Sequence, residues 1–314
     1  MQLLYFFEKL RMPWLDSVML VITQFGGEIL FMALSMSIFW CVSKRLGFYI
    51  FTVGYVGTVI NQALKLMFRI SRPWVQDPNF TIVEGARADA TGYSFPSGHT
   101  QNAASVMLCP ALLTERKWLK AALWTLYFLV AVSRMYLGVH TPLDVGVSLA
   151  LGLILVFALR PLFRKELTPG RLYALGFAML GLTVAYIAYT ELYPFPADIE
   201  TENLEHGVKN GYTLLGALLG MLAGCWVDNR FVHFKTEGSL PAQIVKVALG
   251  LGLVVGIRVA LKSPLNALFG GRYIADTVRY FFMVLFAIGI WPMAFPKINA
   301  LLPRKSSGKA AQSI

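Results

Sequence analysis

Charged residues are scarce in this chain: only 14% of its 314 residues are Asp, Glu, Lys or Arg, whereas 56% are apolar. Soluble domains usually carry about a quarter charged residues. Several apolar runs approach or exceed about eighteen residues, the length that crosses the hydrocarbon core of a bilayer. The composition therefore excludes an ordinary soluble domain and predicts an all-α, polytopic membrane helical bundle.

Cysteine is also rare. The three cysteines, Cys41, Cys109 and Cys225, fall inside predicted spans and form no Cys-x-x-Cys pair. We interpret them as small core residues, which leaves the redox compartment open. The motif region likewise lacks an Asp-x-Asp pair or carboxylate cluster of the kind that holds Mg²⁺, so we expect neither a metal nor another cofactor.

The formal net charge is +11, but in so apolar a chain the basic residues are better explained as anchors of cytoplasmic loops than as a nucleic-acid surface. If the N-terminus lies outside, the inner loops hold a moderate excess of Lys and Arg. The distribution favours an outer N-terminus and an inner C-terminus, with the motifs described below on the extracytoplasmic side. The last residues, 309–314, carry no retention signal, which favours the cytoplasmic or plasma membrane.

The hydropathy pattern predicts about nine spans. Met1 to Ser17 precede them and predict a short amphipathic helix at the membrane interface rather than a cleavable signal. The chain is then divided into a membrane core over residues 1–190, additional spans of unknown role over 191–303 and a tail over 304–314. The predicted spans are 19–42, 47–64, 97–113, 118–135, 142–160, 172–190, 211–227, 242–261 and 279–296.

Three cations stand near the outer end of the second span. On a continuous helix, Lys65, Arg69 and Arg72 share one stripe. Such a stripe is costly unless it meets an anion, although basic clusters that merely flank a membrane are common. The cluster alone therefore leaves phosphate binding and membrane anchoring equally open.

A second motif, Pro96-Ser97-Gly98-His99, opens the third span. The start of a helix exposes unpaired backbone N–H groups that attract phosphate, and Gly98 permits a close approach of the backbone. His99 beside that anion is placed to donate a proton to a leaving oxygen. A lone histidine at a helix start is more often a cap or a surface residue, and here the neighbouring motifs favour the chemical role.

A third motif begins the fifth span. Thr141 and Pro142 are typical of a helix N-cap and first turn, and Asp144 follows within that turn. Asp144 can accept a hydrogen bond from one ring nitrogen of His140, which leaves the other nitrogen as a nucleophile. It can equally serve as a capping-box acid, and the two roles are compatible. Arg134 adds a forked donor suited to two phosphate oxygens.

Together these motifs resemble the signature of the type 2 phosphatidic acid phosphatase (PAP2) superfamily, Lys-x6-Arg-Pro, Pro-Ser-Gly-His and Ser-Arg-x5-His-x3-Asp. The resemblance implies a six-helix core over roughly residues 20–190. The nine predicted spans look more like the glucose-6-phosphatase and sphingosine-phosphate phosphatase branches than like shorter members. The matching residues are Lys65, Arg72, Pro73, Pro96, Ser97, Gly98, His99, Ser133, Arg134, His140 and Asp144.

The resemblance also implies roles. His140 is the expected nucleophile, Asp144 raises its basicity, and His99 is the expected general acid. The remaining members of the site are expected to bind the phosphate oxygens: Lys65, Arg72, Ser97, Gly98 and Arg134. Ser133 is given only a supporting role. The implied activity is metal-independent hydrolysis of a phosphate ester through a phosphohistidine.

A site at the outer ends of spans lies near the lipid headgroups. We therefore expect a lipid phosphate or diphosphate as substrate, of the phosphatidic acid, polyprenyl diphosphate or sphingoid phosphate class, with membrane lipids as the other partners and a homo-oligomer as a further possibility. The loop over 74–95 is expected to cover the site. A phosphotransferase with a lipid or sugar acceptor is the alternative within enzymes.

A lipid transporter or flippase is the alternative of another class. Polar residues within the predicted spans are compatible with a pathway, although interhelical hydrogen bonding explains them more simply. These residues are Glu28, Asn61, Gln62 and Asn102. His206 and His233, the histidines outside the motifs, are expected in solvated loops on opposite sides of the membrane.

Overall fold

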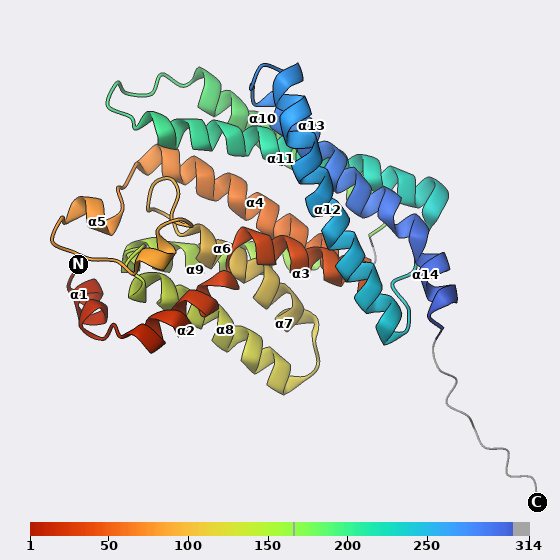
Figure 1. Ribbon diagram of the computed structural model, residues 1–314, viewed down its shortest axis with the longest axis horizontal. Helices are drawn as coiled ribbons and strands as arrows, with labels where there is room; N and C mark the ends of the chain where they lie inside the picture. Colours follow the sequence, from red (N-terminus) through yellow and green to blue (C-terminus); the bar gives the residue numbers. More distant parts are fainter. Residues whose placement is uncertain (166, 304–314) are drawn as a thin grey trace, which may run out of the picture.

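The computed structural model describes residues 1–165 and 167–303, and within these ranges the chain forms helices and no strand. Figure 1 shows α4 crossing the middle of the molecule, with α10 and α11 on one side of it and α3, α6 and α9 on the other. The α-helices are α1 (Gln2–Lys9), α2 (Pro13–Gln24), α3 (Glu28–Cys41), α4 (Lys44–Phe68), α5 (Pro73–Gln76), α6 (Gly98–Ala103), α7 (Cys109–Leu113), α8 (Lys117–Tyr136), α9 (Pro142–Leu159), α10 (Pro169–Leu192), α11 (Thr201–Val227), α12 (Leu240–Leu268), α13 (Ile274–Leu285) and α14 (Phe295–Leu301). This confirms the predicted all-α bundle.

Five helices of the described part are long and apolar enough to cross a membrane, and a sixth crossing is formed if α2 and α3 count as one bent span. The prediction of nine spans was therefore too high by this measure. It also counted α4 and α8, which are long enough but are not among the helices apolar enough to cross, and the segment from α6 to α7, which a π-helical turn over Ala104–Leu108 divides. The five helical segments are Pro142–Phe163, Pro169–Leu192, Thr201–Val232, Leu240–Leu268 and Ile274–Leu301.

The first predicted span is bent. Helices α2 and α3 meet at an angle of 48° across the Gly26–Gly27 pair. A Cβ on Gly26 would clash with the carbonyl oxygen of His99 and would lie 2.9 Å from Cγ1 of Val130. The absence of a side chain thus allows the bend to pack directly against the start of α6.

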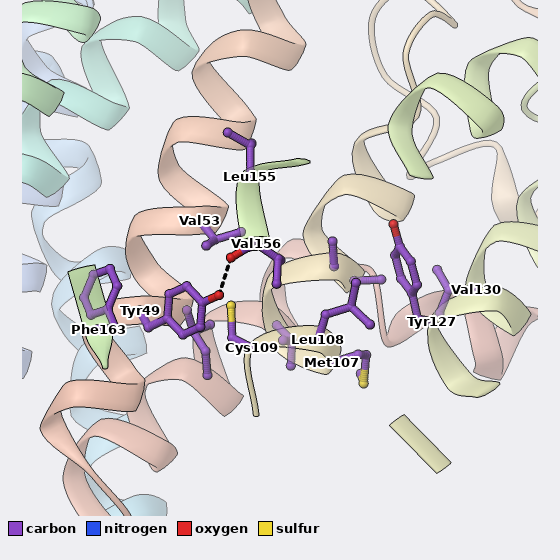
Figure 2. Close-up of a cluster of buried hydrophobic side chains, with 14 residues drawn as sticks. Tyr49, Val53, Met107, Leu108, Cys109, Tyr127, Val130, Leu155, Val156 and Phe163 are labelled. Carbon is purple, nitrogen blue, oxygen red and sulfur yellow. Dashed lines mark hydrogen bonds between the residues drawn. The ribbon is translucent and has the colours of Figure 1, made fainter. Parts of the chain in front are cut away.

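The main apolar core lies where α4 meets the segment from α6 to α7 and helices α8 and α9. Figure 2 shows its large side chains, including Tyr49, Leu108, Tyr127 and Phe163, each of which is fully buried. The hydroxyl of Tyr49 donates to the carbonyl oxygen of Val156, so the one polar atom of that ring is satisfied. This core holds α4, α8, α9 and the segment from α6 to α7 against one another.

Among the spans after residue 190, α11 packs closely against α13 because it carries glycines at the contact. A Cβ on Gly216 or Gly220 would clash with the backbone carbonyl of Thr277 or Phe281 on α13. One on Gly224 would lie 2.9 Å from Cβ of Ile288, in the π-helical turn that follows α13. These glycines recur every four residues on α11 and let two membrane helices approach to backbone contact. This glycine spacing was not predicted to have a role.

Candidate active site

The three sequence motifs meet at one end of the bundle. Lys65 comes from the end of α4, His99 from the start of α6 and Arg134 from the end of α8. His140 precedes Thr141, the N-cap of α9. The predicted stripe of three cations on one helix was wrong. Helix α4 ends at Phe68 and Arg69 takes a left-handed conformation with φ 50°, so Arg72 lies on the loop beyond it.

Arg72 connects the loop that contains Thr91 and Gly92 to the backbone beside His140. Its Nη1 donates to the carbonyl oxygen of Val139 at 2.9 Å and lies 3.0 Å from Nε2 of His140. Its Nε and Nη2 donate to the carbonyls of Gly92 and Thr91, at 3.0 and 2.7 Å. A guanidinium N–H therefore faces the Nε2 atom of a histidine whose side chain is only 2% exposed.

The other ring nitrogen of His140 faces an acid. Its Nδ1 lies 3.5 Å from Oδ2 of Asp144 and 3.5 Å from Oγ of Ser94, and Ser94 donates to the same Oδ2 at 2.6 Å. That oxygen also accepts the backbone N–H of Thr141 at 2.7 Å, while Thr141 Oγ1 accepts the N–H of Asp144, which completes a capping box. The capping role of Asp144 is thus present, and its carboxylate also lies beside Nδ1 of His140, although the 3.5 Å separation is longer than the predicted hydrogen bond.

Ser97 begins α6 as its N-cap, and its Oγ accepts the backbone N–H of Thr100 at 3.4 Å. Gly98 is the first helical residue, and the atom nearest to a Cβ built on it is Oδ1 of Asn61, 3.9 Å away. Nε2 of His99 is buried and has no hydrogen-bond partner among the described residues. The start of α6 therefore presents backbone N–H groups and an imidazole to the same region.

Arg134 is fully buried. Its Nη1 donates to Oγ1 of Thr23 on α2 at 2.7 Å, whereas its Nε and Nη2 find no acceptor among the described residues. Unpaired buried donors of a cation are costly, so their presence points to an anion as their partner. Lys65, 6% exposed, donates from Nζ to the carbonyl of Tyr93.

Burial and neighbouring charges shift the pKa of site residues that lie outside the membrane spans. Burial, followed by the charges of Arg72, Arg134 and Lys65, lowers the pKa of His140 well below its usual 6.5. The imidazole is therefore neutral at pH 7, as a nucleophile must be. Burial also lowers the pKa of Arg72 to about 10, although the nearby Asp144 opposes that shift.

Three polar contacts were not predicted. Ser94 stands between His140 and Asp144, Thr23 holds Arg134, and Asn61 donates to the carbonyl of Pro96 at 3.4 Å. Asn61 had been noted only as a polar residue inside a span. Ser94 and Thr23 belong to no motif, and only their place in the fold brings them to the site.

His206 also departs from expectation. It lies on α11 rather than in a loop, is half-buried, and faces the site across Gly92. His233, in contrast, is exposed at the other end of the same helical segment, where it takes a left-handed conformation with φ 49°.

Comparison with known proteins agrees with this geometry. Residues 44–167, which contain every motif residue, match the PAP2 superfamily, and residues 212–303 match the transmembrane extension of PAP2 superfamily phosphatases. The undecaprenyl-diphosphatase BcrC of Bacillus subtilis (strain 168) is 33% identical over 147 residues, which cover 46% of this chain and 72% of that relative.

The chain belongs to the PAP2 superfamily. The expected class of enzyme, a phosphoric ester hydrolase, is thereby confirmed. The likeness to the nine-span branches stays a prediction.

Two further relatives of this PAP2 protein are phosphatases by name. Phosphatidylglycerophosphatase B of Bacillus subtilis (strain 168) is 29% identical over 163 residues, covering 48% of this chain and 76% of the relative. Lipid A 4'-phosphatase of Bacteroides thetaiotaomicron is 24% identical over 164 residues, covering 48% of this chain and 71% of the relative. No solved structure matches the chain significantly.

Proposed function

We propose that this PAP2 protein hydrolyses a lipid phosphate or diphosphate monoester through a phosphohistidine formed on His140. The observation that carries the proposal is the asymmetry of the His140 ring. Nδ1 faces the Asp144 carboxylate, whereas Nε2 faces a guanidinium on the side of the cation cluster. This arrangement makes Nε2 the attacking atom.

In the first step the lone pair of Nε2 forms a bond to phosphorus while the bond from phosphorus to the leaving oxygen breaks. The N–H of Arg72 that faces Nε2 transfers its hydrogen bond to a phosphate oxygen. The unpaired donors of Arg134 and the N–H groups at the start of α6 bind the other oxygens. In the free protein burial and the charge of Arg134 lower the pKa of His99 well below 6.5, and the negative charge of the bound phosphate opposes this shift. His99 then takes up a proton and gives it to the leaving oxygen.

In the second step a water molecule attacks the phosphohistidine. His99, now neutral, accepts a proton from that water, and the electrons of the P–N bond return to His140 as phosphate leaves. Asp144 stabilises the imidazolium character of His140 in both steps, and Ser94 keeps the carboxylate in place. We expect no metal requirement because fixed cations and backbone dipoles supply the charge stabilisation.

The relatives suggest the class of substrate. Their names refer to phosphatidylglycerophosphate, undecaprenyl diphosphate and lipid A, which are all phosphorylated membrane lipids. A site at the ends of membrane helices can receive such a headgroup without removing the lipid from the bilayer. The loop charges described above favour a site on the extracytoplasmic face. Reporter fusions to the C-terminus and to the loop between α10 and α11 would test this orientation.

The decisive experiment measures phosphate release by the detergent-purified protein in EDTA, with phosphatidic acid, phosphatidylglycerophosphate and polyprenyl diphosphate as substrates. The His140→Ala variant should be inactive yet elute as the wild type does in size exclusion. The His233→Asn variant, altered at an exposed histidine far from the site, should retain activity. Quenching with SDS at alkaline pH and short times should trap an alkali-stable phosphoprotein that later acid treatment hydrolyses, and only when His140 is present.

Three results would contradict the proposal. Substantial activity in His140→Ala would remove the nucleophile, and a strict requirement for a divalent cation would remove the metal-independent mechanism. If the lipid loses its phosphate only when an acceptor alcohol is added, and the phosphate is recovered on that alcohol rather than free, the result would favour the phosphotransferase, which can use the same intermediate.

A further inference from the structure

The transmembrane extension reaches the active site through one histidine. If a Cβ is built on Gly92, Nδ1 of His206 lies 3.8 Å from it and Nζ of Lys65 lies 4.0 Å from it. Apart from Gly92 and its chain neighbours, no other atom of the described residues comes within 4 Å of that point. The carbonyl oxygen of Gly92 in turn accepts the Nε–H of Arg72. His206 therefore borders the same side of the site as two phosphate-binding cations.

The position of His206 is fixed by its neighbours on α11. A Cβ on the adjacent Gly207 would lie 2.8 Å from Cδ1 of Leu66, the residue that follows Lys65 on α4. The hydroxyl of Tyr186 donates to the carbonyl of Gly207 at 2.9 Å. The loop is attached as well, since the hydroxyl of Tyr93 accepts the backbone N–H of Glu200 at 3.3 Å. Close packing and two hydrogen bonds thus hold the start of α11 beside the site.

The hydrogen bonds of His206 select its tautomer. The side-chain amide of Asn210 lies 3.2 Å from Nδ1, and when the amide donates, the ring proton is carried by Nε2. Nε2 makes no hydrogen bond to the described residues. The charges that act on this ring are chiefly positive, because Lys65, Lys209 and Arg72 contribute with only Glu202 opposing them. An N–H donor in such a field favours an anionic oxygen as its acceptor.

We infer that His206 is a substrate-binding residue that contacts a second phosphate group, next to the one being hydrolysed, so that the extension adapts this PAP2 protein to lipid diphosphates. The inference rests on the proposed phosphatase activity and deepens it. It gives the spans after residue 190 a role in substrate choice in addition to packing. The scissile phosphate remains with Lys65, Arg72 and Arg134, while His206 binds the part of the headgroup beyond it.

The test compares two substrates that differ only in the second phosphate, farnesyl diphosphate and farnesyl monophosphate. The His206→Ala variant should raise KM for the diphosphate about tenfold, the equivalent of one lost hydrogen bond to a charged group, and should leave kcat within about twofold. KM for the monophosphate should stay unchanged. The His206→Gln variant keeps a side-chain N–H and should recover part of the diphosphate affinity.

The His233→Asn variant is the matched control, since Asn tolerates the left-handed conformation at that position and should change neither substrate. Equal losses on both substrates in His206→Ala would overturn the inference, because they would indicate a structural role. An unchanged KM for the diphosphate, or a wild-type enzyme that hydrolyses only the monophosphate, would overturn it too. A wild-type protein inactive on every lipid phosphate would instead refute the proposed function, and the inference with it.

Discussion

A single methyl group at the bend between α2 and α3 should misplace His99, the proposed general acid. In a Gly26→Ala variant the new Cβ would clash with the carbonyl oxygen of His99, and it would lie only 2.9 Å from the carbonyl carbon of His99 and from Cγ1 of Val130. Carbon atoms in good contact are about 3.5–4.0 Å apart, so the bend and the start of α6 must separate by at least about 0.6 Å. The backbone of His99 belongs to the start of α6, so this separation displaces it from the bend.

The size of the effect follows from the geometry of proton transfer. A misplacement of about 1 Å can cost about a hundredfold in rate, so we expect kcat to fall between about tenfold and a hundredfold with a lipid phosphate, whose alkoxide leaves poorly. The loss should be much smaller with an aryl phosphate, because a good leaving group needs little help from an acid. The assay is therefore kcat for both substrates, with the same preparation of the variant.

Gly27→Ala is the control for this experiment. The nearest atom to its Cβ would be the carbonyl oxygen of Gln24 at 3.1 Å, in the preceding turn, and no atom of α6 is among its close neighbours. It should affect both substrates little. If Gly26→Ala and Gly27→Ala behave alike, or if the aryl phosphate suffers as much as the lipid, the proposed placement of His99 through this bend is wrong.

Three other predictions concern the rest of the site and the bundle. Ser94→Ala should lower kcat about tenfold by removing one hydrogen bond to Asp144, with KM nearly unchanged, and an equal loss in KM would argue against a positioning role. The pKa of His140 is well below 6.5, so protonation of this group should not lower kcat/KM, corrected for substrate ionisation, at any pH above 6.5. On the alkaline side, kcat/KM should fall as Arg72 loses its charge near pH 10. Gly220→Leu should destabilise the fold by about 1–3 kcal/mol through overpacking against α13, seen as a lower Tm in detergent; an unchanged Tm would contradict the close approach.

The motif residues were predictable because their chemistry is encoded locally. The sequence Thr141-Pro142-Leu143-Asp144 contains its own helix start, and the structure shows the capping box that this pattern predicts. A helix start at Ser97 and Gly98 was also expected, and the structure adds that Ser97 is its N-cap. Spacing along a helix was less reliable at Arg72, since the left-handed Arg69 ends α4 before the stripe is complete.

The residues that escaped prediction are those whose partners are distant in sequence. Ser94 precedes its acceptor Asp144 by 50 positions, and Thr23 lies 111 positions before Arg134. No periodicity connects such pairs, and only the packing of α2, α8 and α9 brings them together. We expected His206 in a loop because the first residues of α11 are polar. The helix in fact begins before the apolar stretch of the sequence.

The burial of the cation cluster links the stability of the protein to the product of its own reaction. Lys65, Arg72 and Arg134 are each at most 6% exposed, and one carboxylate, that of Asp144, lies among them. Their mutual repulsion opposes folding unless an anion is bound, so inorganic phosphate should raise the Tm in proportion to the logarithm of its concentration once the site begins to fill. The same ion competes with the substrate. At a high phosphate concentration the enzyme would therefore be more stable but inhibited. When phosphate is depleted, the inhibition would be relieved and the enzyme would produce phosphate faster.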